Sequence, residues 1–208
     1  LWRKMPVTWI TALVGSLALV GTPFFSGFYS KDSIILATEA AARSGQTGAT
    51  LAHWAVLSGV FVTALYSFRM FFLVFHGKPR WQHADGHGHD GHTGHGDGHH
   101  GEPHESPNVV TVPLVMLAIP SLVIGFVTID AMLFGGFFGK SIVVDAARHP
   151  AMTELMAHFQ GATAMALHGF ATLPVWLDVV GVGLAAFLYL KRPDIPEMLA
   201  QRFGALYR

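Results

Sequence analysis

The 208-residue chain contains no cysteine and few charged side chains, and each shortage excludes a class of protein. Without cysteine the chain can form no disulfide, no cysteine-ligated zinc site and no iron–sulfur cluster of its own. Charged residues make up 12% of the chain, roughly half of the ~25% found in a soluble domain. Basic and acidic residues balance at 13 each, so a surface for nucleic acid is not indicated. The sequence also lacks a phosphate-binding loop, a dinucleotide fingerprint and a nucleophile triad.

What the chain has instead is four long apolar blocks, and 51% of its residues are hydrophobic. Blocks of this length are typical of helical membrane spans rather than of short alternating strands. We therefore predict an all-α polytopic membrane protein with four transmembrane helices, the first of them discontinuous, plus surface amphipathic helices. The predicted segments are a discontinuous span at 1–37, a span at 51–76, a disordered His-rich cytoplasmic loop at 77–108, a span at 109–134, a periplasmic loop with an amphipathic helix at 135–168, a span at 169–191, and a cytoplasmic amphipathic segment at 192–208.

The first block ends on an ionisable residue in an unusual position, Lys31. Residues 5–30 carry no charge, but Gly21, Pro23 and Gly27 interrupt them, and proline both lacks an N–H group and restricts the residue before it. In lipid, the backbone groups freed by such a break must be satisfied by protein or water. An ionisable group in hydrocarbon costs at least about 2.5–3.5 kcal/mol. A lysine just past a helix break therefore predicts a polar cavity and a role in moving ions or protons.

A partly dry cavity makes the neutral form of Lys31 accessible, because the charged form loses hydration there. A lysine that is charged or neutral by turns is a proton carrier. Asp32 follows directly, but adjacent helical residues do not face each other. We therefore expect Asp32 either to sit at the opening of the cavity or to stabilise the protonated lysine through a rearrangement. The alternative interpretation is a simple proline kink with Lys31 reaching the membrane interface. The roles of Asp178, the lone charge within the fourth apolar block, and of Arg69 stay open.

The loop between the second and third spans is of a different composition. Residues 83–104 contain eight of the 13 histidines, together with many glycines. Such tracts can bind zinc, nickel or copper, although these spacings do not match a defined four-ligand site. A metal-binding or scaffolding membrane protein is therefore one alternative function. Lysine and arginine are concentrated near the termini and this loop, which predicts that these parts face the cytoplasm.

The segment at 21–32, Gly-Thr-Pro-Phe-Phe-Ser-Gly-Phe-Tyr-Ser-Lys-Asp, closely resembles the broken helix of the distal antiporter-like subunit of respiratory complex I, the subunit L family of NADH:quinone oxidoreductases. The histidine-rich loop, His168-Gly169-Phe170 and the basic stop Lys191-Arg192-Pro193 are also similar to bacterial members. The resemblance covers the whole chain, which looks like a piece from the C-terminal half of such a subunit. Sodium/proton antiporter subunits share the broken helix, and some of them carry glutamate at the lysine position, so a sodium/proton antiporter is the second alternative.

The resemblance implies proton translocation across a bacterial inner membrane, coupled remotely to NADH oxidation and quinone reduction. Lys31 and Asp32 match the family's proton-transfer positions, and Gly21, Pro23 and Gly27 match its helix break. The partners implied are the other membrane-arm subunits and the lipid bilayer. NADH, FMN, iron–sulfur clusters and quinone would be used by the rest of a translocating enzyme complex, and this chain would hold no cofactor or metal and perform no redox chemistry.

Overall fold

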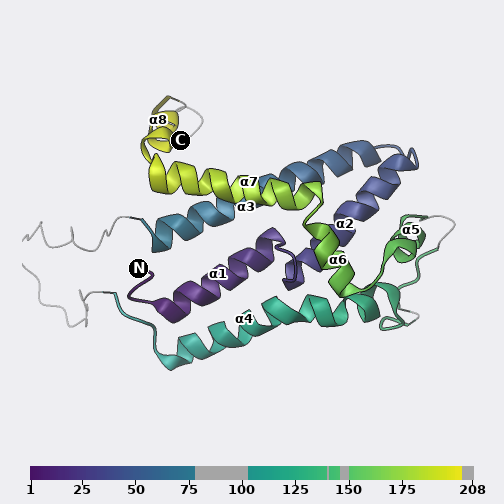
Figure 1. Cartoon of the computed structure of the whole chain (residues 1–208), viewed down its shortest axis with the longest axis horizontal. Helices are drawn as coiled ribbons and strands as arrows, with labels where there is room; N and C mark the ends of the chain where they lie inside the picture. The colour runs from purple at the N-terminus through teal and green to yellow at the C-terminus, as the bar shows by residue number, and fades with distance from the viewer. Residues whose placement is uncertain (78–102, 140, 146–149, 203–208) are drawn as a thin grey trace, which may run out of the picture.

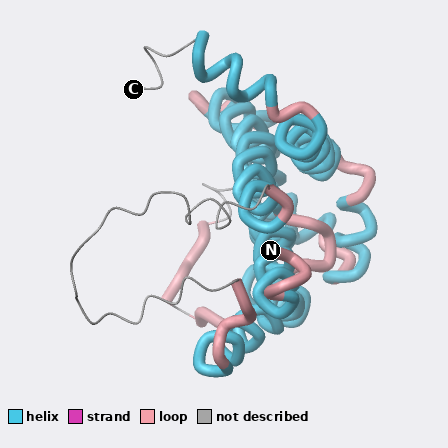
Figure 2. The backbone as a smooth tube through the Cα atoms, turned by 90° about the vertical axis from the view of Figure 1, so that its left-hand side faces the viewer, coloured by secondary structure: helices cyan, strands magenta, loops and turns pink. Residues whose placement is uncertain are grey.

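The described part of the chain consists of helices joined by loops. The computed structural model describes residues 1–77, 103–139, 141–145 and 150–202, so most of the loop predicted at 77–108 lies outside the described residues. Within those residues no strand is present, and Figure 2 views the helices from the end that carries the N-terminus. The α-helices are α1 (Pro6–Val20), α2 (Ser26–Arg43), α3 (Ala49–Phe75), α4 (Asn108–Ile129), α5 (Pro150–His158), α6 (Ala162–Gly169), α7 (Leu173–Ala186) and α8 (Asp194–Arg202). Two π-helical turns, η2 (Asp130–Phe134) and η3 (Phe187–Lys191), extend α4 and α7.

Among the described residues, three helical segments are long and apolar enough to cross a membrane, namely Ala49–Phe75, Asn108–Phe134 and Leu173–Lys191. With no strand among the described residues, they confirm the predicted fold class, an all-α polytopic membrane protein. The first predicted span is divided between α1, of 15 residues, and α2, of 18 residues, and neither meets the same test alone. A fourth crossing by the α1 and α2 pair therefore stays a prediction.

Several helix termini lie at one or the other end of the molecule, whereas the break between α1 and α2 lies near its middle (Figure 1). The N-terminus, the last turns of α3 and α7, and α8 lie at one end, and α5 lies with the last turn of α2 at the other. α3 packs against α7, α1 and α2, whereas α4 packs against α1 and α2. α4 leaves most of its apolar surface exposed.

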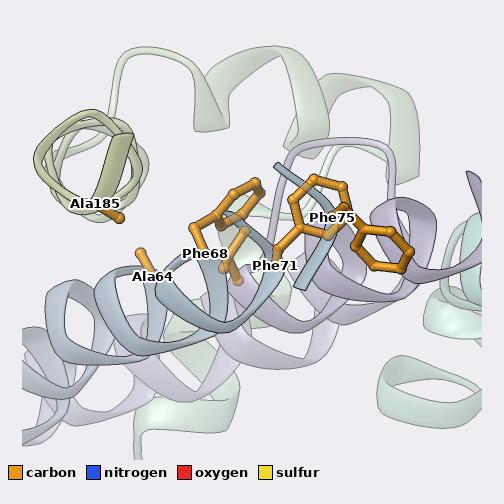
Figure 3. Packing of buried hydrophobic residues seen from close by; sticks show 6 residues of the cluster. Ala64, Phe68, Phe71, Phe75 and Ala185 are labelled. Carbon is orange, nitrogen blue, oxygen red and sulfur yellow. The ribbon is translucent and has the colours of Figure 1, made fainter. Parts of the chain in front are cut away.

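Small residues bring α3 and α7 close together. Ala64 of α3 and Ala185 of α7 are both fully buried and point toward each other in Figure 3. A Cβ atom on Gly181 would lie 2.8 Å from the Cβ of Ala64 and 2.9 Å from the carbonyl oxygen of Phe61, so only glycine fits there. Close approach through small residues is typical of helices in membranes. The contact fixes α7 on α3, and the same cluster continues through Phe68, Phe71 and Phe75 to Val20 at the end of α1.

The N-terminus of α1 is capped from a distant part of the chain. The carboxylate of Glu105 accepts hydrogen bonds from the Thr8 hydroxyl (2.6 Å) and from the backbone N–H of Val7 (2.7 Å). These donors lower the pKa of Glu105, the Thr8 hydroxyl most, followed by the Val7 amide. An acidic group at this position satisfies free N–H groups and opposes the positive end of the helix dipole. The segment that leads into α4 is thus attached to α1.

The segment before the last apolar helix differs from the expectation. The sequence predicts a single amphipathic helix in the loop at 135–168. The structure has two helices there, α5 and α6, because the chain turns at Gly161, whose φ of 99° is left-handed. α6 does not lie apart from the other helices, since Ala166 is fully buried and a Cβ on Gly169 would lie 2.5 Å from the ring of Phe28 on α2. α6 therefore forms part of the wall around the break between α1 and α2.

Candidate functional site at the helix break

The break between α1 and α2 is a tightly defined turn. α1 ends at Val20, and Gly21 follows with φ 89° and ψ 41°, a left-handed conformation that glycine adopts without steric cost. Phe24 also has a positive φ of 73°, which is uncommon for a bulky residue and costs on the order of 1–3 kcal/mol. A Cβ on Gly27 would lie 1.8 Å from the carbonyl oxygen of Ala18, so the start of α2 sits directly against the last turn of α1. The surrounding packing holds this conformation.

Lys31 reaches back across the break and satisfies groups on two other helices. Its Nζ donates a hydrogen bond to the carbonyl oxygen of Val20, the last residue of α1. The same nitrogen lies 3.2 Å from Oδ1 and 3.4 Å from Oδ2 of Asp178 on α7. A cation at this position satisfies a free carbonyl and faces the negative end of the α1 dipole. The Lys31 and Asp178 side chains are 23% and 10% exposed, so this is a largely buried ion pair.

Gly21 is necessary to this geometry in a second way. A Cβ on Gly21 would lie 2.8 Å from Cδ of Lys31 and 3.6 Å from its Nζ. The lysine side chain therefore lies along the face of the turn that has no side chain. Gly21 therefore forms part of the surface on which Lys31 rests.

Asp32 lies between two cavities and takes no part in the ion pair. It is 6% exposed and lines a small cavity of about 10 Å³, which Lys31 and Asp178 also line. That volume is close to the space of one water molecule. Asp32 also lines a larger cavity of about 560 Å³. In the described part of the chain, the ion pair of Lys31 is with Asp178 and not with its sequence neighbour.

We call the larger cavity the vestibule. It is lined by residues of the second half of α2, of α5 and α6, and by Phe134. Arg43, at the end of α2, lies 2.5 Å from Glu39 within the same helix and 3.5 Å from Glu154 of α5, and the second of these ion pairs joins α5 to α2. The polar and ionisable side chains that line the vestibule are those of Asp32, Ser33, Glu39, Arg43, Glu154, His158, Gln160, His168 and Thr172. The arrangement supplies a polar region at the end of the molecule opposite to the N-terminus (Figure 1).

The structure also places the residues whose roles the sequence left open. Asp178 is brought to Lys31 although 147 residues separate them, and its position as a lone acid in an apolar helix was the signal available in the sequence. Arg69 is exposed on α3, with its guanidinium 5.4 Å from the centre of the Tyr189 ring, away from the break site. Asp130 is exposed at the start of η2. In the described residues no group of three or more histidine and acidic side chains could hold a metal ion, and the histidines at 83–100 lie outside those residues.

Comparison with known proteins finds relatives along the whole chain. The chain is 49% identical to NADH-quinone oxidoreductase subunit L of Neisseria meningitidis over 99% of its own length and 30% of that protein. It is 34% identical to NAD(P)H-quinone oxidoreductase chain 5 of Picosynechococcus sp. over 99% of its length and 29% of the relative. It is 35% identical to NADH-ubiquinone oxidoreductase chain 5 of Cryptococcus neoformans over 92% of its length and 25% of the relative. No family model matches the chain. The resemblance inferred from the broken-helix motif is confirmed, and the chain spans about 30% of the length of the subunit L proteins of Neisseria meningitidis.

Proposed function

Because the chain is homologous over 99% of its length to part of NADH-quinone oxidoreductase subunit L, we propose that it translocates protons as part of such a membrane subunit. Lys31 is the group that gains and loses the proton, and Asp32 is the acid at the outlet of its cavity. The translocation is driven by NADH oxidation and quinone reduction in other subunits. The membrane is a bacterial inner membrane, and the partners are the lipid bilayer and the other membrane-arm subunits.

The observation that carries this proposal is the position of the Lys31 ammonium group. It lies at the break between two helices, against a free helix carbonyl and one carboxylate, and next to a water-sized cavity. Asp32 lines both this cavity and the vestibule. A lysine that merely extended to the interface from a kinked helix would not need these partners. A largely buried ammonium group that can give its proton to a water molecule in a neighbouring cavity is a suitable proton carrier.

The interaction energy between Lys31 and Asp178 is comparable to the work of moving a proton across the membrane. Moving one charge across the membrane potential is worth about 2.3 kcal/mol per 100 mV. Two unit charges about 4 Å apart interact by about 4 kcal/mol at an effective dielectric constant of ~20. Forming or breaking the contact between Lys31 and Asp178 therefore changes the energy of the proton-loaded state by an amount comparable to the work of translocation.

In this proposal, the redox groups of the complex are bound by other subunits and not by this chain. Iron–sulfur clusters need cysteine thiolates, and the sequence contains no cysteine. In the proposal, NADH, FMN, the clusters and quinone react on other subunits. The present residues hold, orient and release protons, and they receive the driving energy through the neighbouring subunits.

The proposal is tested in the intact complex by measuring protons translocated per NADH oxidised in membrane vesicles. Lys31→Ala is expected to lower this ratio sharply, and Asp32→Asn is expected to lower it while leaving the contact between Lys31 and Asp178 in place. Lys191→Ala is the matched control, because Lys191 is an exposed lysine at the end of η3. An unchanged ratio in Lys31→Ala would rule out the proposal. Transport that depended on sodium and not on NADH would instead support an antiporter.

A further inference from the structure

Asp178 is a buried acid that the sequence assigned to no site. It lies on α7 and is 7% exposed, and both of its carboxylate oxygens lie within 3.4 Å of the Nζ of Lys31. The small cavity beside it is lined mainly by glycine and apolar side chains. A charged carboxylate in such surroundings is costly unless it is paired. Within the described residues, the pairing cation is Lys31.

The position of the carboxylate is fixed by helix packing. Gly181 lies three residues after Asp178 on α7, and its close contact with Ala64 and Phe61 seats α7 on α3. Val175, one turn before Asp178, is buried in the cluster that contains Phe28 and Tyr29 of α2. The packing of α7 against α3 and α2 therefore fixes the backbone position of Asp178 beside the break.

Lys31 has two acceptors of different kinds. The carbonyl oxygen of Val20 carries only a partial charge and belongs to α1, whereas Asp178 can carry a full negative charge and belongs to α7. A small movement of α7 relative to α2 would change the second contact and leave the first in place. The carboxylate is thus the partner that can change how firmly the ammonium form is held.

We propose that Asp178 is the counter-ion that holds Lys31 in its protonated form and draws the next proton to it after release. This inference rests on the proposed function. While the ion pair is formed, the ammonium group keeps its three protons. When the pair separates, the ammonium group gives one proton to a water molecule on the Asp32 side, which leaves a neutral amine and a hydronium ion. The buried carboxylate then remains unpaired, and its negative charge favours reprotonation of the amine. Asp178 is a positioning residue, since it acts through Lys31.

A set of variants in the intact complex tests this role. Asp178→Asn keeps the size of the side chain and removes the charge, and it is expected to lower the number of protons per NADH to about the level of Lys31→Ala. Asp178→Glu, which keeps the charge, is expected to recover part of the ratio. Asp130→Asn is the matched control, because Asp130 is an exposed acid in the apolar segment Asn108–Phe134. The decisive combination is Lys31→Ala with Asp178→Asn, which should be no worse than Lys31→Ala alone, whereas a merely structural role would make the two losses add.

The outcomes separate the two proposals. If Lys31→Ala lowers the ratio and Asp178→Asn behaves as Asp130→Asn does, the counter-ion role is overturned and the proposed function stands. If Lys31→Ala leaves the ratio unchanged, the proposed function itself fails. Should Asp178→Asn prevent assembly of the complex, the exchanged pair Lys31→Asp with Asp178→Lys decides. If the exchanged variant assembles, the ion pair is supported. If it does not assemble, the counter-ion role is overturned.

Discussion

Gly21 offers a way to move Lys31 without changing its chemistry. In Gly21→Ala, the new Cβ would lie 2.8 Å from Cδ of Lys31, and alanine would have to adopt a φ of 89°. A left-handed conformation costs about 1–2 kcal/mol for a residue other than glycine. The lysine side chain must also move by roughly half an ångström to reach an ordinary van der Waals distance. The ammonium group lies 3.2 Å from Asp178, so a displacement of this size away from the carboxylate carries it beyond hydrogen-bond distance.

We expect Gly21→Ala to assemble and to oxidise NADH, but to translocate fewer protons per NADH. A penalty of about 1–2 kcal/mol corresponds to roughly a 5- to 30-fold loss in the population of the native turn. The assay is proton uptake into membrane vesicles, set against the rate of NADH oxidation. Gly15→Ala is the control, because it lies on the same helix and an added Cβ has nothing within 4 Å.

A second variant separates the two effects of Gly21→Ala. Asparagine tolerates the left-handed conformation better than alanine does, yet it adds the same Cβ. If the displacement of Lys31 causes the loss, Gly21→Asn should lose coupling as Gly21→Ala does. If backbone strain is the cause, Gly21→Asn should recover much of it. Full coupling in Gly21→Ala, equal to that of Gly15→Ala, would refute the reasoning that the turn supports the lysine.

Two further predictions concern the packing of α1. Gly27→Ala places a Cβ 1.8 Å from the backbone oxygen of Ala18, which cannot move aside as a side chain can, so we expect a loss of at least about 1–3 kcal/mol and less assembled complex, measured by native electrophoresis. Because the pKa of Glu105 is lowered in the folded state, its cap on α1 is complete above about pH 4.3 and is lost as the pH falls through the lower folded value. Glu105→Gln should therefore speed hydrogen exchange in the first turn of α1 at neutral pH, with no such change in Glu197→Gln; equal exchange rates in the two variants would contradict the cap.

The break could be predicted from the sequence because its signals are local. Gly21, Pro23 and Gly27 stand within seven residues of one another, and Lys31 is the first charge after a long apolar run. Each signal follows from backbone geometry or from the cost of a charge in an apolar environment, without knowledge of the fold. The same holds for the apolar helices, whose length and composition are enough to identify them.

The partner of Lys31 could not be predicted in this way. Asp178 was recognisable as a lone acid in an apolar helix, but its pairing depends on how α7 seats on α3, a contact between segments far apart in the chain. The sequence also did not predict the division between α5 and α6, because a single glycine, Gly161, interrupts a pattern that otherwise fits one amphipathic helix. The vestibule arises from that division, because α6 turns inward against α2.

The most direct measurement is the water structure around Lys31 in a high-resolution experimental density map of the intact complex. We expect the ammonium group to lie at the break, in contact with Val20 and Asp178, with ordered water leading from it past Asp32 into the vestibule. A map in which this ammonium group extends into bulk solvent, with dry protein between it and Asp32, would contradict the account.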